Sequence, residues 1–240
     1  MTTPSHRLSP SDSIDDQNTK QVTLTFSRHR DDPAFFKVKL GNLKLGKVHE
    51  SEIADMNLAN RTVYKGEELQ KIRLLITRRQ VRHKSMALLA RRPWSTKALS
   101  DRLKENSFDP QAIEMEMAYL SEEGWLDDQK SAGLILESLT EKNPTSRMFA
   151  EEKLKAKGFD EEVISTTLDH YYAQVDLPEM LKNMAIERRA LLLKTHPDLS
   201  AQKQARRIAN QIERRGFDEE SVKTAISQAG FEIEEPISDA

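Results

Sequence analysis

The 240-residue sequence has no cysteine, few glycines and prolines, and no long apolar run. Without cysteine, disulfides, thiolate nucleophiles and zinc–thiolate sites are excluded. With 8 Gly and 9 Pro, the chain has few breakers of regular structure, which favours long helices over a sandwich of short strands. No apolar stretch approaches the ~20 residues that span a bilayer. The first twenty residues lack the apolar core of a secretory signal, so we expect a cytoplasmic protein without membrane contact.

Motifs of catalysis are missing as well. The six histidines show no HxxxH or HxH spacing, so the sequence predicts no metal site. There is no glycine-rich phosphate loop and no nucleophile elbow. We therefore expect a protein that is not an enzyme, that needs no cofactor and no small-molecule substrate, and that acts by binding a charged macromolecule.

Charge is distributed in blocks, although the formal net charge is only −2. Residues 71–104 contain eleven basic residues and one acid, whereas residues 105–138 contain nine acids and one base. Residues 182–215 contain nine bases and three acids. Blocks of opposite sign predict surfaces of opposite potential that can steer a charged partner. The alternative interpretation is a set of solvated helix faces that neutralise one another.

The first quarter of the chain has the only strand signals. Alternating apolar residues predict strands at 21–27 and 34–42, with a third short one at 43–49 and a helix at 51–58. From residue 67 onward the pattern is helical. The segment 71–92 predicts a helix with Leu74, Val81 and Leu88 on one face, ending before Pro93. Trp94 and Trp125 are interpreted as core anchors.

Three segments of similar sequence then recur: NSFDPQAI (106–113), KGFDEEVI (157–164) and RGFDEESV (215–222). Their phenylalanines are 51 and 58 residues apart, which is typical of repeats of two to three helices. The residue before each Phe is expected to end a helix in the left-handed conformation, and Ser107 is the one non-glycine there, so the first copy is expected to end differently. The Asp after each Phe is expected to cap the next helix. The residues assigned a structural role are Phe108, Asp109, Gly158, Phe159, Asp160, Gly216, Phe217, Asp218, Trp125, Asp127 and Asp128.

With these residues the chain resembles the RecX family, regulators of the RecA recombinase. The resemblance rests on EEGWLDDQKSAG (122–133) after the first copy and on RRGFDEESV (214–222) in the last. It extends to ALLARRPWSTKALSDRL (87–103) and to the segment 46–69, and covers about residues 40–230. The stretches 140–158 and 173–200 depart from the family pattern.

The resemblance implies a mainly α fold, with three tandem three-helix repeats in an elongated, curved array after a small N-terminal β-containing segment. It implies a protein that binds RecA–single-stranded DNA filaments and inhibits recombinase ATPase and strand exchange, and so modulates homologous recombination, DNA repair and the SOS response. The alternatives are a helical-repeat nucleic-acid-binding module without a recombinase partner, and a co-chaperone that uses the loop His196-Pro197-Asp198.

The expected organisation is a disordered N-terminus (1–19), a small β-containing segment (20–66), helical repeats 1 (67–142), 2 (143–196) and 3 (197–232), and an acidic C-terminal tail (233–240). For binding DNA or the filament, the arginines of 78–82 are expected to form a ridge on one helix face, unless Glu122, Glu123, Asp127 or Asp128 pairs with them. The candidate binding residues are Arg78, Arg79, Arg82, Lys84, Arg91, Arg92, Arg102, Lys104, Arg147, Lys155, Arg206, Arg207, Arg214 and Arg215.

Overall fold

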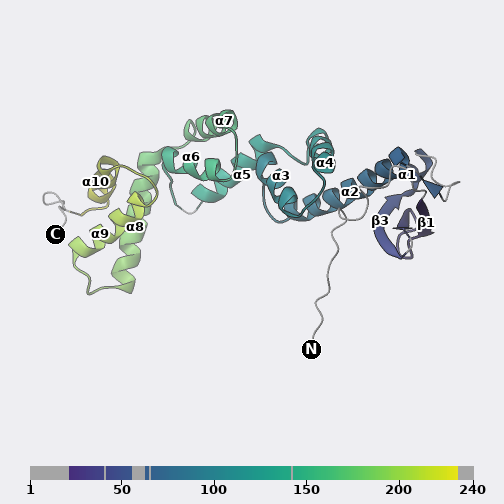
Figure 1. The fold of residues 1–240 in the computed structure, drawn as a ribbon. Helices are drawn as coiled ribbons and strands as arrows, with labels where there is room; N and C mark the ends of the chain where they lie inside the picture. The colour runs from purple at the N-terminus through teal and green to yellow at the C-terminus, as the bar shows by residue number, and fades with distance from the viewer. Residues whose placement is uncertain (1–21, 41, 56–62, 65, 142, 232–240) are drawn as a thin grey trace. The chain divides into compact units, whose positions relative to one another are not determined.

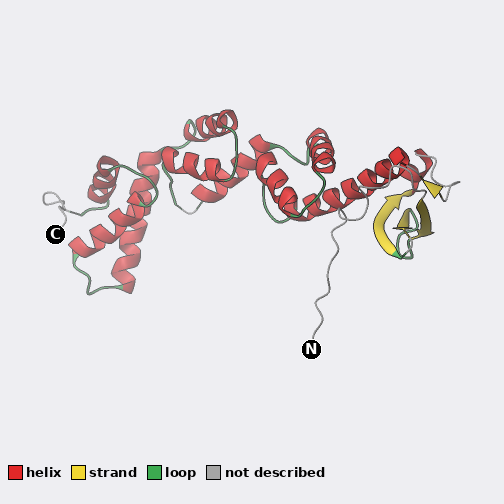
Figure 2. Ribbon diagram, viewed as in Figure 1, coloured by secondary structure: helices red, strands yellow, loops and turns green. Residues whose placement is uncertain are grey.

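The protein is mainly helical, with one small antiparallel sheet at the N-terminal side (Figures 1 and 2). This architecture confirms the predicted fold class in its coarse form. The predictions for residues 1–19 and 233–240 lie outside the described residues. The computed structural model describes residues 22–40, 42–55, 63–64, 66–141 and 143–231.

The chain divides into two compact units, which are described separately. The first comprises Met1–Arg91 and Ser100–Leu120, and the second comprises Arg92–Leu99 and Ser121–Ala240. The arrangement as three tandem repeats, and the boundaries given to them above, stay predictions.

The sheet belongs to the first unit and contains the three predicted strands. They are β1 (Val22–Arg28), β2 (Phe35–Leu40) and β3 (Leu43–His49). A fourth strand, β4 (Val63–Tyr64), pairs with β1, and the order is β3-β2-β1-β4 with antiparallel neighbours. Two residues are too few to show an alternating pattern, which explains why β4 was not predicted.

The sheet is stabilised by packing against a helix, as a small sheet requires. The long helix α2 (Gly66–Leu89) contributes Ile72 and Ile76 to a buried cluster that contains apolar side chains from all of the first three strands. At Gly46 of β3 the helix comes so close that an added Cβ would lie 2.5 Å from Cγ2 of Ile76. The short helix α1 (Glu50–Asp55) adds Ile53 to the same cluster.

Helix α2 begins five residues earlier than the predicted start at residue 71, and it ends at Leu89, before Pro93 as predicted. Its buried face differs from the predicted one, because Leu74 and Leu88 are only half-buried. The first half of the helix faces the sheet, so packing against the strands selects the face. The buried residues of α2 are Leu69, Ile72, Ile76, Val81 and Ser85.

Eight further helices follow in the described residues. In the second unit one buried cluster joins the fifth, sixth and seventh helices of the chain, and another joins the eighth, ninth and tenth. The bounds are α3 (Thr96–Glu105), α4 (Pro110–Glu122), α5 (Asp128–Thr140), α6 (Arg147–Ala156), α7 (Glu161–Tyr172), α8 (Leu177–Thr195), α9 (Ala201–Glu213) and α10 (Glu219–Gln228).

The three recurring segments form the predicted helix endings. Gly158 and Gly216 have φ of 80° and 81°. Ser107 has φ of 59°, so the expectation that the first copy ends differently is wrong: this serine takes the left-handed conformation despite its Cβ. In the second copy, Phe159 N donates to Leu154 O at 3.4 Å, which is the long hydrogen bond of a Schellman ending.

The aspartates after the phenylalanines begin the next helices, as predicted. Asp109 accepts from the backbone N–H groups of residues 111 and 112, and Asp218 accepts from that of Ser221. Asp160 occupies the same position without a side-chain cap bond. A further ending of this type occurs at Gly230, where φ is 81° and Phe231 N donates to Ile226 O at 3.3 Å. It was missed because Glu rather than Asp follows Phe231.

Two of these glycine turns contact the first turn of an earlier helix in the second unit. Ser95 Oγ, just before α3, donates to Lys157 O at 2.7 Å. Ser146, the N-cap of α6, donates its backbone N–H to Arg215 O at 3.0 Å. An added Cβ at Gly216 would lie 2.5 Å from Ser146 Oγ. A serine at a helix start therefore fits against a later glycine turn in both places.

Candidate functional site

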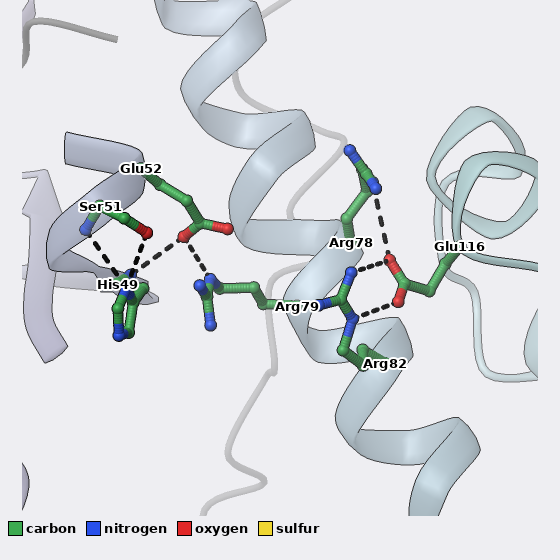
Figure 3. Close-up of polar contacts among 7 residues, drawn as sticks. All are labelled: His49, Ser51, Glu52, Arg78, Arg79, Arg82 and Glu116. Atoms are coloured by element: carbon green, nitrogen blue, oxygen red, sulfur yellow. Dashed lines mark hydrogen bonds and ion pairs between the residues drawn. The ribbon is translucent and has the colours of Figure 1, made fainter. Parts of the chain in front are cut away.

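The arginines of α2, predicted to form a ridge that binds phosphates, are engaged by carboxylates of the same unit (Figure 3). Arg82 donates from Nε and Nη2 to the two oxygens of Glu116, which is fully buried on α4. Arg78 Nε lies 3.6 Å from the same carboxylate. Burial acts to lower the pKa of Arg82, but the hydrogen bond and charge of Glu116 outweigh it, and the pKa is raised.

Arg79 has a different partner, Glu52 of α1, with Nε 2.5 Å from Oε2 (Figure 3). Its guanidinium also lies 5.1 Å from the centre of the Phe35 ring. The α2 arginines are thus paired within the first unit, as the alternative interpretation held, but the predicted partners are wrong. Glu52 and Glu116 are far from α2 in sequence, so no local pattern identifies them.

Asp127 and Asp128, which were assigned a structural role from the sequence, make different contacts. Asp127 is the N-cap of α5 and accepts from Lys130 N at 2.9 Å. Asp128 accepts instead from the backbone N and Oγ1 of Thr96 at the start of α3, each at 2.8 Å. Trp125 beside them is 56% exposed, so its interpretation as a core anchor is wrong, and Leu126 is buried in its place. Trp94 is half-buried, with the Arg92 guanidinium 3.6 Å from its ring centre.

Several other candidate cations form exposed ion pairs with acids on the same helix or on the next one. Exposed ion pairs contribute little to stability. Arg215 is held differently, because its Nη2 donates to the backbone oxygens of Leu139 and Asn143, each at 3.3 Å. Lys84 is half-buried and Arg91 is exposed. The exposed pairs are Arg102–Glu105, Lys104–Asp101, Arg147–Asp169 and Lys155–Glu151.

Helix α9 carries the most open basic surface among the predicted candidates. Its buried side consists of Gln204, Ile208, Ala209 and Ile212. Lys203, Arg207 and Arg214 recur at spacings of four and seven residues, which places them on one face of the helix, opposite the buried side. Arg206 flanks this face, and all four side chains are exposed. We call Lys203, Arg206, Arg207 and Arg214 the α9 ridge.

No ion pair involves the α9 ridge within the part of the chain that the structure describes. Lys203 was not among the predicted binding residues, although its spacing from Arg207 and Arg214 is a visible signal. Exposed cations one helical turn apart can follow a row of phosphates or an acidic protein surface. The structure therefore brings together Arg206, Arg207 and Arg214 on one free surface and separates Arg215 from them.

The tripeptide His196-Pro197-Asp198 lies in the exposed connection between α8 and α9. His196 Nδ1 is 2.8 Å from Thr195 Oγ1, and Ser200, not Asp198, is the N-cap of α9. The co-chaperone alternative stays a prediction. Among the described residues, no group of three or more His, Asp or Glu side chains is arranged to hold a metal ion. None of the described helices is both long and apolar enough to cross a membrane.

The fold and the α9 ridge define a mainly helical protein with an open cationic surface. No protein-family model matches the sequence. It is similar to regulatory protein RecX of Bacillus subtilis, with 26% identity over 64% of this chain and 56% of that protein, so the chain spans little more than half of that relative's length. It is also similar to regulatory protein RecX of Chlorobaculum tepidum, with 27% identity over 59% of this chain and 83% of that protein.

The fold is similar to solved structures as well. A crystal structure of regulatory protein RecX matches 86% of this chain with a TM-score of 0.60 at 14% identity, and 99% of that chain is covered. The RecX structure from Lactobacillus salivarius matches 64% of this chain with a TM-score of 0.50 at 14% identity, and 96% of that chain is covered. The sequence relatives confirm the resemblance to the RecX family noted in the sequence, and the solved structures confirm the similarity of fold.

Proposed function

We propose that this protein binds RecA–single-stranded DNA filaments and inhibits their ATPase and strand exchange, and thereby modulates homologous recombination, DNA repair and the SOS response. The α9 ridge is the observation that carries the proposal, because it offers four exposed cations without an anionic partner in the described chain. The regulatory name of the RecX relatives supports a role in control rather than in catalysis.

The α9 ridge suits a partner that presents regularly spaced negative charge. Thirteen helical residues span about 20 Å, so the ridge is long enough to meet several consecutive phosphates. Each cation that neutralises a phosphate of a single strand contributes about 0.7 to the slope of log K against log salt concentration. If all four cations contact phosphates of the filament, the slope for binding should therefore be steeper by about 3 than if none of them does.

The proposal is tested by titrating the protein into RecA assembled on single-stranded DNA and following ATP hydrolysis at several salt concentrations. We expect inhibition at protein concentrations well below those that bind naked DNA. Neutralising the α9 ridge with Lys203→Gln, Arg206→Gln, Arg207→Gln and Arg214→Gln should weaken inhibition and flatten its salt dependence. Undiminished inhibition by this variant would remove the ridge from the interface, and no inhibition by the unaltered protein would remove the filament as target.

A matched control removes the same number of charges elsewhere. Lys97, Lys130, Lys153 and Lys223 are exposed and lie on four other helices of the chain, so their replacement by Gln changes net charge equally. If both variants lose inhibition to the same extent, net charge rather than the ridge determines binding.

A nucleic-acid-binding module without a recombinase partner is the second candidate, because the α9 ridge is equally suited to phosphates outside a filament. The two functions differ in one observable property. A filament regulator binds tightly only when recombinase is present, whereas a plain nucleic-acid binder has the same affinity for the strand with and without it.

A further inference from the structure

The α9 ridge differs from the other basic surfaces of the chain. Arginines of α2 are held by Glu52 and Glu116, and exposed cations on α3, α6, α8 and α10 pair with acids on their own or neighbouring helices. The four cations of the ridge have no such acid among the described residues. Like charges one helical turn apart repel one another, so the ridge is a surface on which an anion is stabilising.

A strongly acidic segment of the same chain begins next to α9. Residues 232–240, with the sequence EIEEPISDA, contain four acids and no base. The residue before them, Phe231, is buried in the same cluster as Ile208 and Ile212 of α9. The guanidinium of Arg189 lies 4.7 Å from the centre of the Phe231 ring and donates to Ala229 O at 2.5 Å. The starting point of the acidic segment is therefore fixed on the buried side of α9, across the helix from the ridge.

The length of the segment is sufficient to pass round α9 and reach the ridge. Nine residues in extended conformation span about 30 Å, whereas half the circumference of a helix about 10–12 Å across is about 17 Å. Attachment at Phe231 gives the acids an effective concentration near the ridge of about the millimolar range. An acidic segment at that concentration competes with phosphates for the same cations, and the competition depends on salt.

We propose that the acidic segment 232–240 binds the α9 ridge and acts as an intramolecular competitor of the nucleic-acid backbone. The acids farther along the segment, Glu234, Glu235 and Asp239, then occupy positions of phosphates on cations of the α9 ridge. A filament, which presents many phosphates in a row, displaces the segment, while an isolated short strand competes less well. The effect of the segment on filament binding rests on the proposed function. The contact between the segment and the ridge does not, because it is internal to the chain.

The contact is tested on the full chain without DNA or recombinase. A carbodiimide joins a carboxylate to a lysine amine in direct contact, and mass spectrometry of the digest identifies the pair. We expect a cross-link between Lys203 and a carboxylate of residues 232–239 that disappears at high salt. Cross-links of these acids only to lysines on other helices, or none to Lys203, would overturn the proposal.

The competition is tested with a variant that neutralises the segment by Glu232→Gln, Glu234→Gln, Glu235→Gln and Asp239→Asn. Its affinity for a short fluorescein-labelled oligothymidylate, measured by anisotropy at low salt, should rise by about tenfold, within the usual range for coupling between two ligands. The control variant neutralises four exposed acids on other elements, Glu114, Glu122, Glu123 and Glu137, and should change affinity much less. An equal rise in both variants would overturn competition at the ridge.

The two proposals fail in different ways. If the protein inhibits filaments but the neutralised segment leaves strand affinity unchanged, the competition is wrong and the function stands. If neither the unaltered protein nor the neutralised variant inhibits filaments, the proposed function is wrong, and the cross-link to Lys203 alone decides whether the segment binds the ridge.

Discussion

Replacing Gly216 by Ala should destabilise the second unit, and two other glycines provide internal controls. Gly124, Gly158 and Gly216 all have φ between 72° and 81°, a conformation that costs an L-residue about 1–2 kcal/mol. They differ in what an added Cβ would contact. At Gly124 no atom lies within 4 Å, at Gly158 Ser95 Oγ lies at 3.2 Å, and at Gly216 Ser146 Oγ lies at 2.5 Å.

The contact distances determine the order of the three losses of unfolding free energy. For Gly124→Ala only the backbone cost applies, and the reduced entropy of the unfolded chain offsets about half of it, which leaves about 1 kcal/mol. At Gly216 the new Cβ would also lie 2.8 Å from Phe149 Cβ, which cannot rotate away. Overpacking of this kind costs about 1–3 kcal/mol more. We therefore expect a loss of about 2–4 kcal/mol for Gly216→Ala and an intermediate value for Gly158→Ala.

Urea denaturation followed by circular dichroism and by tryptophan fluorescence measures these losses, because both tryptophans lie in the second unit. The decisive quantity is the difference in the loss of unfolding free energy between Gly216→Ala and Gly124→Ala. The comparison requires that the slope of unfolding free energy against urea concentration is the same in both variants. If the three substitutions cost the same, the contact between the serine at a helix start and the later glycine turn contributes nothing, and only backbone conformation matters.

Four further outcomes are expected. Glu116→Gln leaves Arg82 without its buried carboxylate and should lower the free energy of unfolding of the first unit by about 3–5 kcal/mol, measured by thermal unfolding. A loss below about 1 kcal/mol would contradict a buried ion pair. The hydrogen bonds of Ser221 to Asp218 lower the pKa of the Asp218 carboxyl. The contribution of this group to stability is therefore present above the pKa of the unfolded state and is lost as pH falls through the lower pKa of the folded state. A carbon-detected NMR titration of the carboxyl measures the folded pKa. Burial raises the pKa of the Tyr172 hydroxyl to about 12, so the contribution of this group to stability is present below pH 10 and is lost as pH rises through 12. Ionisation of Tyr172 near pH 10, seen as a rise in tyrosinate absorbance, would refute the burial. Trp125→Ala should change the free energy of unfolding by less than about 0.5 kcal/mol, because the exposed ring buries little area, and a larger loss in urea denaturation would restore it to the core.

Features that depend on neighbouring residues could be predicted from the sequence. Helix endings at Gly158 and Gly216 and the caps at Asp109 and Asp218 are set by backbone conformation and by hydrogen bonds over a few residues. The three main strands follow from local alternation in the same way. Ser107 shows the limit of this reasoning, because this serine takes the left-handed conformation despite its Cβ.

The choice among basic surfaces could not be predicted, because it depends on residues distant in the chain. Arg82 and Arg207 have the same chemistry and similar helical surroundings in the sequence, but a buried carboxylate 34 residues away engages Arg82, whereas Arg207 is exposed. Trp125 is a comparable case, since the glycine turn exposes its ring and buries Leu126. The sequence by itself determined the helix endings at Gly158 and Gly216, the helix starts after Asp109 and Asp218, and the family that the chain resembles, because these depend on short-range backbone preferences and ordered motifs. Only the tertiary structure decided which cations are neutralised and which are open to a partner, because charge pairing depends on distance in space rather than along the chain.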